Sequence, residues 1–176
     1  PVWYLGMHHN SEVILTSATD DLAMDFSAEG RDLVVEHGHL FDIALREDRA
    51  SMQRWKITNG GGVRAAGVGG AIMGRGADLL IIDDYFKSVE EALSETIRSK
   101  LHQWYLSTSS TRLSPEGAIL IVATRWHHKD LIGQLLIDAQ QTGEQWRVIS
   151  FPAIGDDGAA LWPERWPIEK MQSLRG

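Results

Sequence analysis

Residues 74–84, with the sequence GRGADLLIIDD, decide the fold of this chain. Residues 79–82 are four consecutive apolar residues, and two adjacent carboxylates, Asp83 and Asp84, follow them. A short unbroken apolar run favours a strand that is buried on both faces, as in a parallel sheet. Because neighbouring strand residues point to opposite faces, we expect the two carboxylates to have different roles at the carboxyl end of this strand.

Two interpretations of the aspartates are open on these residues alone. In a nucleotide-hydrolysing site, one carboxylate holds Mg²⁺ and the other places the attacking water, which is the pattern of a Walker B motif. Alternatively, Asp83 and Asp84 only cap the turn after a buried strand.

Composition narrows the class of protein. The 176 residues suffice for one domain with a core, and the absence of cysteine excludes disulfides and thiolate zinc sites. No stretch is apolar enough to span a bilayer and no signal peptide opens the chain, so a cytoplasmic setting fits. The net charge of −7 means that any contact with DNA is expected from a local patch, another domain or an assembled ring. Since the first residue is Pro1, we expect a piece of a longer polypeptide.

The first half of the chain predicts alternating helices and strands. Residues 1–6 are typical of the end of a helix, and residues 13–17 of a buried strand. Thr19 is expected to cap a helix that ends at Gly38, with a possible break at Gly30. The predicted apolar stripe of that helix is Leu22, Phe26, Leu33 and Val34. Residues 38–54 give no clear pattern, and residues 55–68 predict a hairpin around Asn59-Gly60.

The glycine-rich residues 67–76 do not form a phosphate-binding loop of the Walker A type, because they lack the required Gly-Lys-Ser/Thr ending. They are interpreted as flexible backbone that positions Arg75. A solvated loop arginine is the equally open alternative.

The second half predicts a helix before a turn, and a strand, a helix and a last strand after it. Residues 88–91 form a capping box, and the helix after it carries Leu93, Ile97, Leu101 and Trp104 at helical spacing. Residues 114–117 predict a turn, and residues 118–123 a second strand buried on both faces. A helix over 131–139, a last strand over 146–151 and a proline-containing exit segment over 152–168 follow.

These elements predict an α/β fold with a mostly parallel, doubly wound sheet flanked by helices. Thr124, Arg125 and Trp126 follow the second apolar strand, so adjacent placement of the two strands would bring them into one cleft with Asp83 and Asp84. The pairs His8-His9 and His127-His128 are interpreted as surface or packing residues, since no third ligand stands at a recognised spacing.

The motifs together resemble a known family. The stretch GVGGAIMGRGADLLIIDD, the helix with SETIR and WYLSTSSTRL, and the segments ILIVATRWHHKDLIGQLL, FPA and LWPERWP follow one another in the order found in the large terminase subunit of tailed bacteriophages. The resemblance covers most of the chain and is strongest over residues 67–136.

The resemblance implies a viral DNA-packaging motor. Large terminases combine a P-loop ATPase domain with an RNase H-like nuclease domain, and a ring of subunits pumps DNA through the portal vertex of the procapsid. This chain is similar to the central and later part of the ATPase domain, over residues 1–151, and residues 152–176 match the exit toward the nuclease. The Walker A segment of the family lies upstream of the position matched by Pro1. The implied cofactors are ATP and Mg²⁺.

The resemblance also assigns roles to single residues. Asp83 matches the Walker B aspartate of the Mg²⁺ shell, and Asp84 the position that orients water, for which Glu90 or Glu91 is an alternative. Thr124, with Arg125 and Trp126, matches the coupling motif that responds to the state of the nucleotide. Arg75 matches an arginine that some terminases supply to a neighbouring subunit's ATP.

The implied partners are double-stranded DNA, the portal protein and procapsid, the small terminase subunit and further copies of the same subunit in a ring, with no membrane. The expected location is the cytoplasm of the bacterial host, transiently at the portal vertex. Tyr85 stands where many relatives have proline, and we expect little effect from it. The competing interpretations are a helicase-like P-loop translocase and a non-catalytic α/β interaction module.

Overall fold

The computed structural model describes residues 1–70 and 76–173. The chain divides into two compact units, Pro1–Ile137 and Asp138–Gly176. The first unit holds the whole sheet and the second holds short elements only. The predicted boundary between residues 151 and 152 marks the expected end of the ATPase domain and not a division between compact units. It stays a prediction.

A six-stranded, mostly parallel sheet organises the first unit, in the order β2-β3-β4-β1-β5-β6. The central strand β1 pairs in parallel with β4 and β5, and β5 pairs in parallel with β6. Only the β2–β3 and β3–β4 pairs are antiparallel among the described strands. The strands span Glu12–Ser17 (β1), Leu45–Ala50 (β2), Arg54–Ile57 (β3), Gly62–Gly67 (β4), Ala77–Asp83 (β5) and Leu113–Val122 (β6).

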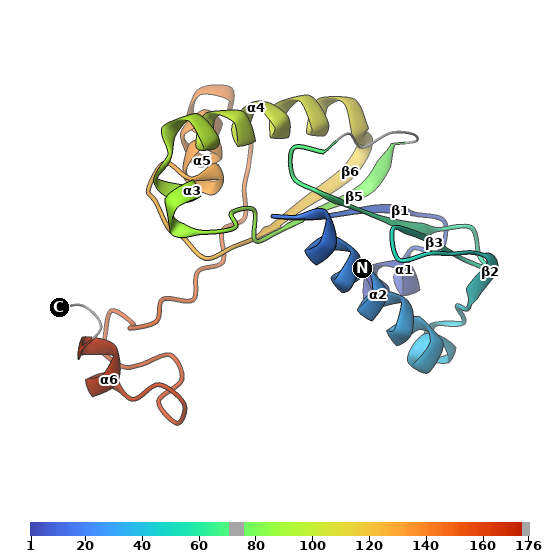
Figure 1. Ribbon diagram of the computed structural model, residues 1–176, viewed down its shortest axis with the longest axis horizontal. Helices are drawn as coiled ribbons and strands as arrows, with labels where there is room; N and C mark the ends of the chain where they lie inside the picture. Colours follow the sequence, from blue (N-terminus) through green and yellow to red (C-terminus); the bar gives the residue numbers. More distant parts are fainter. Residues whose placement is uncertain (71–75, 174–176) are drawn as a thin grey trace. The chain divides into compact units, whose positions relative to one another are not determined.

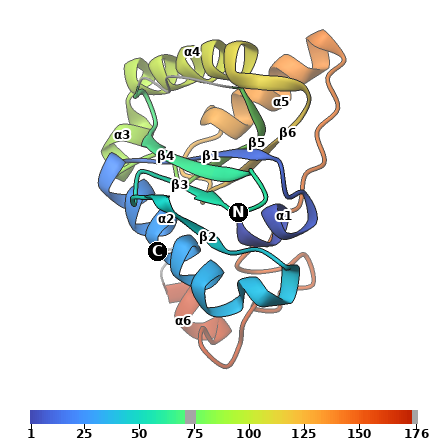
Figure 2. The ribbon, with the colours of Figure 1, turned by 90° about the vertical axis from the view of Figure 1, so that its right-hand side faces the viewer.

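Helices cover both faces of the sheet, as the α/β prediction required. Helices α1 (Val2–Met7) and α2 (Asp20–His37) lie against one face, and α3 (Val89–Leu93) and α4 (Glu95–Arg112) against the other (Figures 1 and 2). The 3₁₀ turn η1 (Gly38–Phe41) follows α2, and α5 (Leu131–Thr142) follows β6. Within residues 1–70 and 76–173, no helix is long and apolar enough to cross a membrane.

Helix α2 packs on the sheet through small residues. Thr19 Oγ1 accepts a hydrogen bond from Leu22 N at 3.1 Å, which confirms the predicted cap. The predicted apolar stripe is partly wrong, because Leu33 is exposed whereas Ser27 and Gly30 are buried. Small residues let the helix approach the indole of Trp55, whose Nε1–H donates to both oxygens of Ser27. Gly30 therefore continues the helix and does not break it.

The predicted hairpin is confirmed by β3 and β4, in which Trp55 pairs with Val63. Gly60 occupies the turn with φ of 108°, a conformation that glycine adopts without steric cost. Trp55 is fully buried and joins the apolar core between the sheet and the α1–α2 face.

The helix predicted from residue 88 is interrupted at Ser94. Ser88 Oγ accepts from Glu91 N, so the predicted cap is present at the start of α3. Ser94 has extended backbone and its Oγ accepts from Ile97 N, which starts α4 as a separate helix. Leu93 is exposed, contrary to the prediction, because the break at Ser94 separates it from the stripe of α4.

Strand β6 departs from two predictions. Residues 114–117, predicted as a turn, lie within the strand, where the register with β5 jumps from Ala77↔Leu113 to Leu79↔Ala118. The strand lies at the edge of the described sheet, and alternate residues along it are exposed, so it is not buried on both faces. Leu120 and Val122 are 48% and 50% exposed.

The second unit contains little regular structure. Gly143, with φ of 78°, follows the last turn of α5, and its N–H donates to Ala139 O at 2.9 Å. The strand predicted over residues 146–151 is wrong, since no described strand pairs with this segment and Phe151 is exposed. A single antiparallel bridge joins Ile154 to Ala160, and the short helix α6 (Ile168–Ser173) follows.

Candidate functional site

The carboxyl ends of three parallel strands bring the sequence motifs together. Asp83 is in register with Ser17 at the end of β1 and with Val122 at the end of β6. Two residues beyond Val122, Thr124 begins the TRWHH segment. Strands β5 and β6 are therefore adjacent, and the polar residues that end or follow them lie at the same end of the sheet.

Asp84 is fixed by backbone bonds on both sides. Its N–H donates to Val122 O at 2.9 Å, and its carbonyl accepts from Ala18 N at 3.1 Å. Its φ is 51°, in the left-handed region that few residues other than glycine adopt. This turn presents the Asp84 side chain to solvent next to Asp83. A non-glycine residue held in such a conformation is a recurrent feature of functional sites.

Asp83 is half-buried beside a second negative charge. Burial, and then repulsion from the carboxylate of Asp84, raise the pKa of Asp83 above its ordinary value. A divalent cation would reverse this effect, because it favours the ionised form of both groups. Ser17, on the neighbouring strand, is fully buried and its hydroxyl has no hydrogen-bond partner among the described residues. The oxygen donors at this strand end are of the kind that Mg²⁺ prefers.

Tyr85, directly after the two aspartates in the sequence, is a buried residue. Its ring is buried, and its hydroxyl has no hydrogen-bond partner within the described chain. Burial, and then the negative charge of Asp130, raise the pKa of the Tyr85 phenol, so the hydroxyl keeps its proton. Tyr85 therefore offers a neutral polar group in an otherwise closed region.

The segment after β6 folds around Arg125. Its Nε donates to Asp130 Oδ2 at 2.6 Å, and its Nη2 reaches His128 O at 3.4 Å. Asp130 is fully buried, and its other oxygen, Oδ1, accepts from Gly133 N at 2.9 Å at the start of α5. A Cβ at Gly133 would lie 2.0 Å from His128 O, so only glycine leaves room for this loop. Arg125 thus links the end of β6 to the start of α5.

The structure places the predicted site residues differently. Asp83 and Asp84 lie at the end of β5, and Thr124, Arg125 and Trp126 are exposed beyond the adjacent strand β6. Arg75 lies outside the described residues. The alternative carboxylates differ from each other: Glu91 Oε2 accepts from Lys87 N at 3.0 Å, whereas the side chain of Glu90 is exposed on α3.

Sequence reasoning missed Asp130 and the groups around it. A carboxylate directly before an apolar helical stripe is the signal of a helix cap, and residues 130–136 carry it. The ion pair with Arg125 gives no sequence signal, because both residues lie in an irregular loop. Within the described part of the chain, no three histidine, aspartate or glutamate side chains converge to hold a metal ion. That finding is compatible with Mg²⁺ bound by one or two carboxylates together with substrate phosphates.

Comparisons with known proteins give matches among solved structures. Neither a protein-family model nor a curated protein sequence matches the chain. Among solved structures, the crystal structure of the HK97 bacteriophage large terminase is similar with a TM-score of 0.48 and 13% sequence identity. The similarity covers 92% of this chain and 32% of the terminase chain, so the chain spans about a third of that protein's length.

Proposed function

We propose that this chain forms part of the ATP-hydrolysing motor of a phage large terminase, the enzyme that packages viral DNA. The observation that carries the proposal is the adjacency of β5 and β6. The Asp83-Asp84 pair and the TRWHH segment lie at or just beyond the carboxyl ends of these two strands, at the same end of the sheet. These are the two motifs on which the sequence resemblance is most specific. A role as a non-catalytic module would not explain why both motifs lie at the same end of the sheet.

A second observation concerns the free edge of the described sheet. Strand β6 is apolar, and side chains on it are about half exposed, with no strand beyond it among the described residues. An exposed apolar edge strand invites pairing with another strand. We propose that the strand leading to the phosphate-binding Walker A loop pairs with β6 in the parent polypeptide. That loop would then lie beside Asp83 and Thr124.

Each carboxylate has a distinct part in the proposed mechanism. Asp83 would hold the Mg²⁺ of the bound nucleotide, and the ion supplies charge neutralisation on the phosphates when it is bound. The Asp84 carboxylate accepts a hydrogen bond from the attacking water and orients it. The two backbone hydrogen bonds of Asp84 fix the main chain from which that carboxylate extends, which favours accurate placement of the water.

The segment after β6 would couple the site to motion. Thr124 stands next to the proposed nucleotide, and Arg125 joins the loop to α5 through Asp130. A displacement of the β6 end on hydrolysis would therefore move the start of α5. Double-stranded DNA, the portal protein and procapsid, the small subunit, a ring of copies and a nuclease domain elsewhere in the polypeptide belong to this proposal.

The test uses the parent polypeptide that contains this chain. Asp83→Asn should weaken binding of Mg²⁺-ATP, since it removes a charge next to a divalent ion. Asp84→Asn should leave binding largely intact and lower turnover by about 100-fold, the cost of misplacing a reacting group. Nucleotide binding is measured with a fluorescent ATP analogue, and turnover by phosphate release.

Asp42→Asn supplies a matched control. Asp42 is also an exposed aspartate in left-handed backbone, with φ of 54°, but it precedes the edge strand β2. Asparagine tolerates this conformation, so both substitutions change charge without changing the backbone. Equal turnover in the Asp84→Asn and Asp42→Asn variants would contradict a catalytic role for Asp84. Unchanged Mg²⁺-ATP binding in the Asp83→Asn variant would contradict the proposed metal site.

A further inference from the structure

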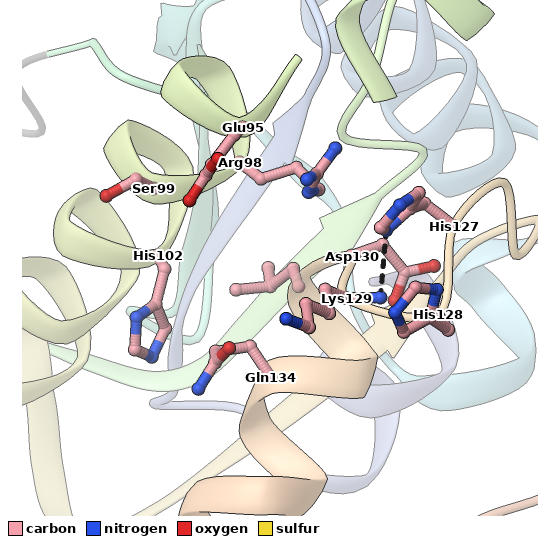
Figure 3. A pocket seen from close by; sticks show the side chains of 10 residues that line it. Glu95, Arg98, Ser99, His102, His127, His128, Lys129, Asp130 and Gln134 are labelled. Carbon is pink, nitrogen blue, oxygen red and sulfur yellow. Dashed lines mark hydrogen bonds between the residues drawn. The ribbon is translucent and has the colours of Figure 1, made fainter. Parts of the chain in front are cut away.

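A polar groove of about 550 Å³ lies between the amino-terminal half of α4 and the loop that joins β6 to α5 (Figure 3). Two of its cationic or imidazole side chains, Arg98 and His102, come from α4. Three more, His127, His128 and Lys129, come from the loop. Leu131 is the only apolar residue that the described lining contains. The groove therefore presents donors of hydrogen bonds from two sides.

The two carboxylates of the lining do not cancel these charges equally. Asp130 is fully buried, and both of its oxygens are bonded, to Arg125 Nε and to Gly133 N. Its negative charge is therefore balanced by an arginine outside the lining. Glu95, in the first turn of α4, is the remaining acidic group. In a chain with a net charge of −7, this gathering of basic groups is a local feature.

The basic groups are held in place by their neighbours. Arg98 Nη1 donates to Ala92 O at 2.6 Å, and Figure 3 shows its guanidinium extending from α4 toward His127. The backbone N–H of Lys129 donates to His127 Nδ1 at 3.0 Å, which leaves Nε2 as the donor of the neutral ring. The rings of His127 and His128 stack with centroids 4.4 Å apart.

This lining fits a phosphate group better than other ligands. Guanidinium, ammonium and imidazole N–H groups are the usual donors to phosphate oxygens. The described lining contains no tryptophan, tyrosine or phenylalanine on which a base could stack. We propose that this groove binds a phosphate group through Arg98, Lys129 and the paired imidazoles of His127 and His128. The phosphate belongs either to the backbone of DNA or to a free phosphate compound, and the choice of DNA rests on the proposed function.

Binding should strengthen as the pH falls. Partial burial, and then the positive charges of Arg98 and His128, lower the pKa of His127, so its ring is mostly neutral at pH 7. Protonation of the His127 ring adds positive charge facing the phosphate. The other charged or titratable groups facing these rings are Glu95, Arg98 and His102 on α4, and Arg125, Lys129 and Asp130 on the loop.

The test measures binding by the 176-residue chain without ATP hydrolysis. A short fluorescein-labelled DNA duplex is titrated with protein and followed by fluorescence anisotropy. Lys129→Ala should weaken binding by about 2- to 5-fold, the effect of one exposed ion pair, and reduce the salt dependence by about one counterion. Glu95→Gln should strengthen binding, and Lys129→Arg should preserve it.

Arg49→Ala is the matched control. It also removes one exposed positive charge, but from β2 at the opposite edge of the sheet, so affinity should stay unchanged. Equal weakening in the Lys129→Ala and Arg49→Ala variants would mean that DNA affinity depends only on the net charge of the protein. That result would overturn the proposal.

Inorganic phosphate and pyrophosphate distinguish the two sources. Their binding is followed through the NMR signals of His127 and His128. DNA binding that depends on Lys129 supports a backbone phosphate, whereas shifts with inorganic phosphate or pyrophosphate alone support a free phosphate compound. If replacement of Lys129 changes neither the binding of DNA nor the binding of the inorganic ions, the groove does not bind phosphate. None of these measurements requires ATP hydrolysis. A refuted ATPase proposal would therefore leave the result for the groove valid, and the reverse also holds.

Discussion

Replacement of Asp130 tests whether one buried carboxylate holds the segment between β6 and α5. Its Oδ2 receives the Arg125 Nε hydrogen bond at 2.6 Å, and its Oδ1 caps α5 by accepting from Gly133 N at 2.9 Å. Asp130→Asn keeps an oxygen for the cap and loses the charge. Asp130→Ala loses both interactions. The two variants therefore separate the ion pair from the cap.

The expected magnitudes follow from burial. Breaking a fully buried pair costs about 3 to 5 kcal/mol, but the Arg125 side chain is 44% exposed and regains hydration when released. A hydrogen bond to a charged group is worth about 1.5 to 3 kcal/mol, so we expect Asp130→Asn to cost about 2 kcal/mol. Loss of a cap adds about 1 kcal/mol, which gives about 3 kcal/mol for Asp130→Ala.

Urea unfolding of the 176-residue chain measures these costs. With an m-value of about 2 kcal/mol/M, the Asp130→Asn midpoint should fall by about 1 M. Thr19→Ala is the control, since Thr19 caps α2 through Leu22 N without any ion pair and should cost about 1 kcal/mol. If Asp130→Asn costs less than about 0.5 kcal/mol and Asp130→Ala no more than Thr19→Ala, the bond to Arg125 contributes nothing and the reasoning fails.

Further predictions concern the strand ends and the proposed motor. The raised pKa of Asp83 means that its folded form holds a proton more tightly than its unfolded form. The free energy of unfolding should therefore fall as the pH rises from the ordinary aspartate pKa through the raised pKa of Asp83. The urea midpoint of the Asp83→Asn variant should lack this pH dependence. Ser17→Ala removes a buried hydroxyl without a hydrogen-bond partner among the described residues, so its urea midpoint should be unchanged or higher, and a clear decrease would indicate an unseen partner. Thr124→Ala should keep most ATPase activity of the parent polypeptide and abolish DNA translocation, whereas proportional loss of both would indicate a catalytic or folding role. Arg75→Ala subunits mixed with Asp83→Asn subunits should recover ATPase activity in assembled rings, because intact Arg75 on one subunit serves intact Asp83 on the next. No recovery at any ratio would place the action of Arg75 within its own subunit.

The sequence alone determined the elements whose signals are local. The apolar run 79–82, the cap at Thr19 and the Asn-Gly turn of the hairpin all depend on neighbours within a few residues, and the structure contains each of them. The two unbroken apolar runs also indicated strands of a parallel sheet, but only the folded structure shows that β5 and β6 are neighbours.

Tertiary structure decided what depends on partners distant in the sequence. The segment 146–151 has the composition of a strand but finds no strand to pair with among the described residues. Strand β6 has the apolar run of an interior strand and yet lies at the edge of the described sheet. Helix α2 buries Ser27 and Gly30 and exposes Leu33, because the helix must approach Trp55 of strand β3 closely.

The candidate site shows the same division. The residue types at Asp83, Asp84 and Thr124 were identifiable because the carboxyl ends of apolar strands are where polar side chains gather. The left-handed backbone of Asp84 depends on hydrogen bonds to Val122 and Ala18, and the groove near Lys129 depends on the packing of α4 beside the β6–α5 loop. Hydrogen bonds and clusters of charge between separate segments exist only once the chain has folded, and no local pattern of residues specifies them.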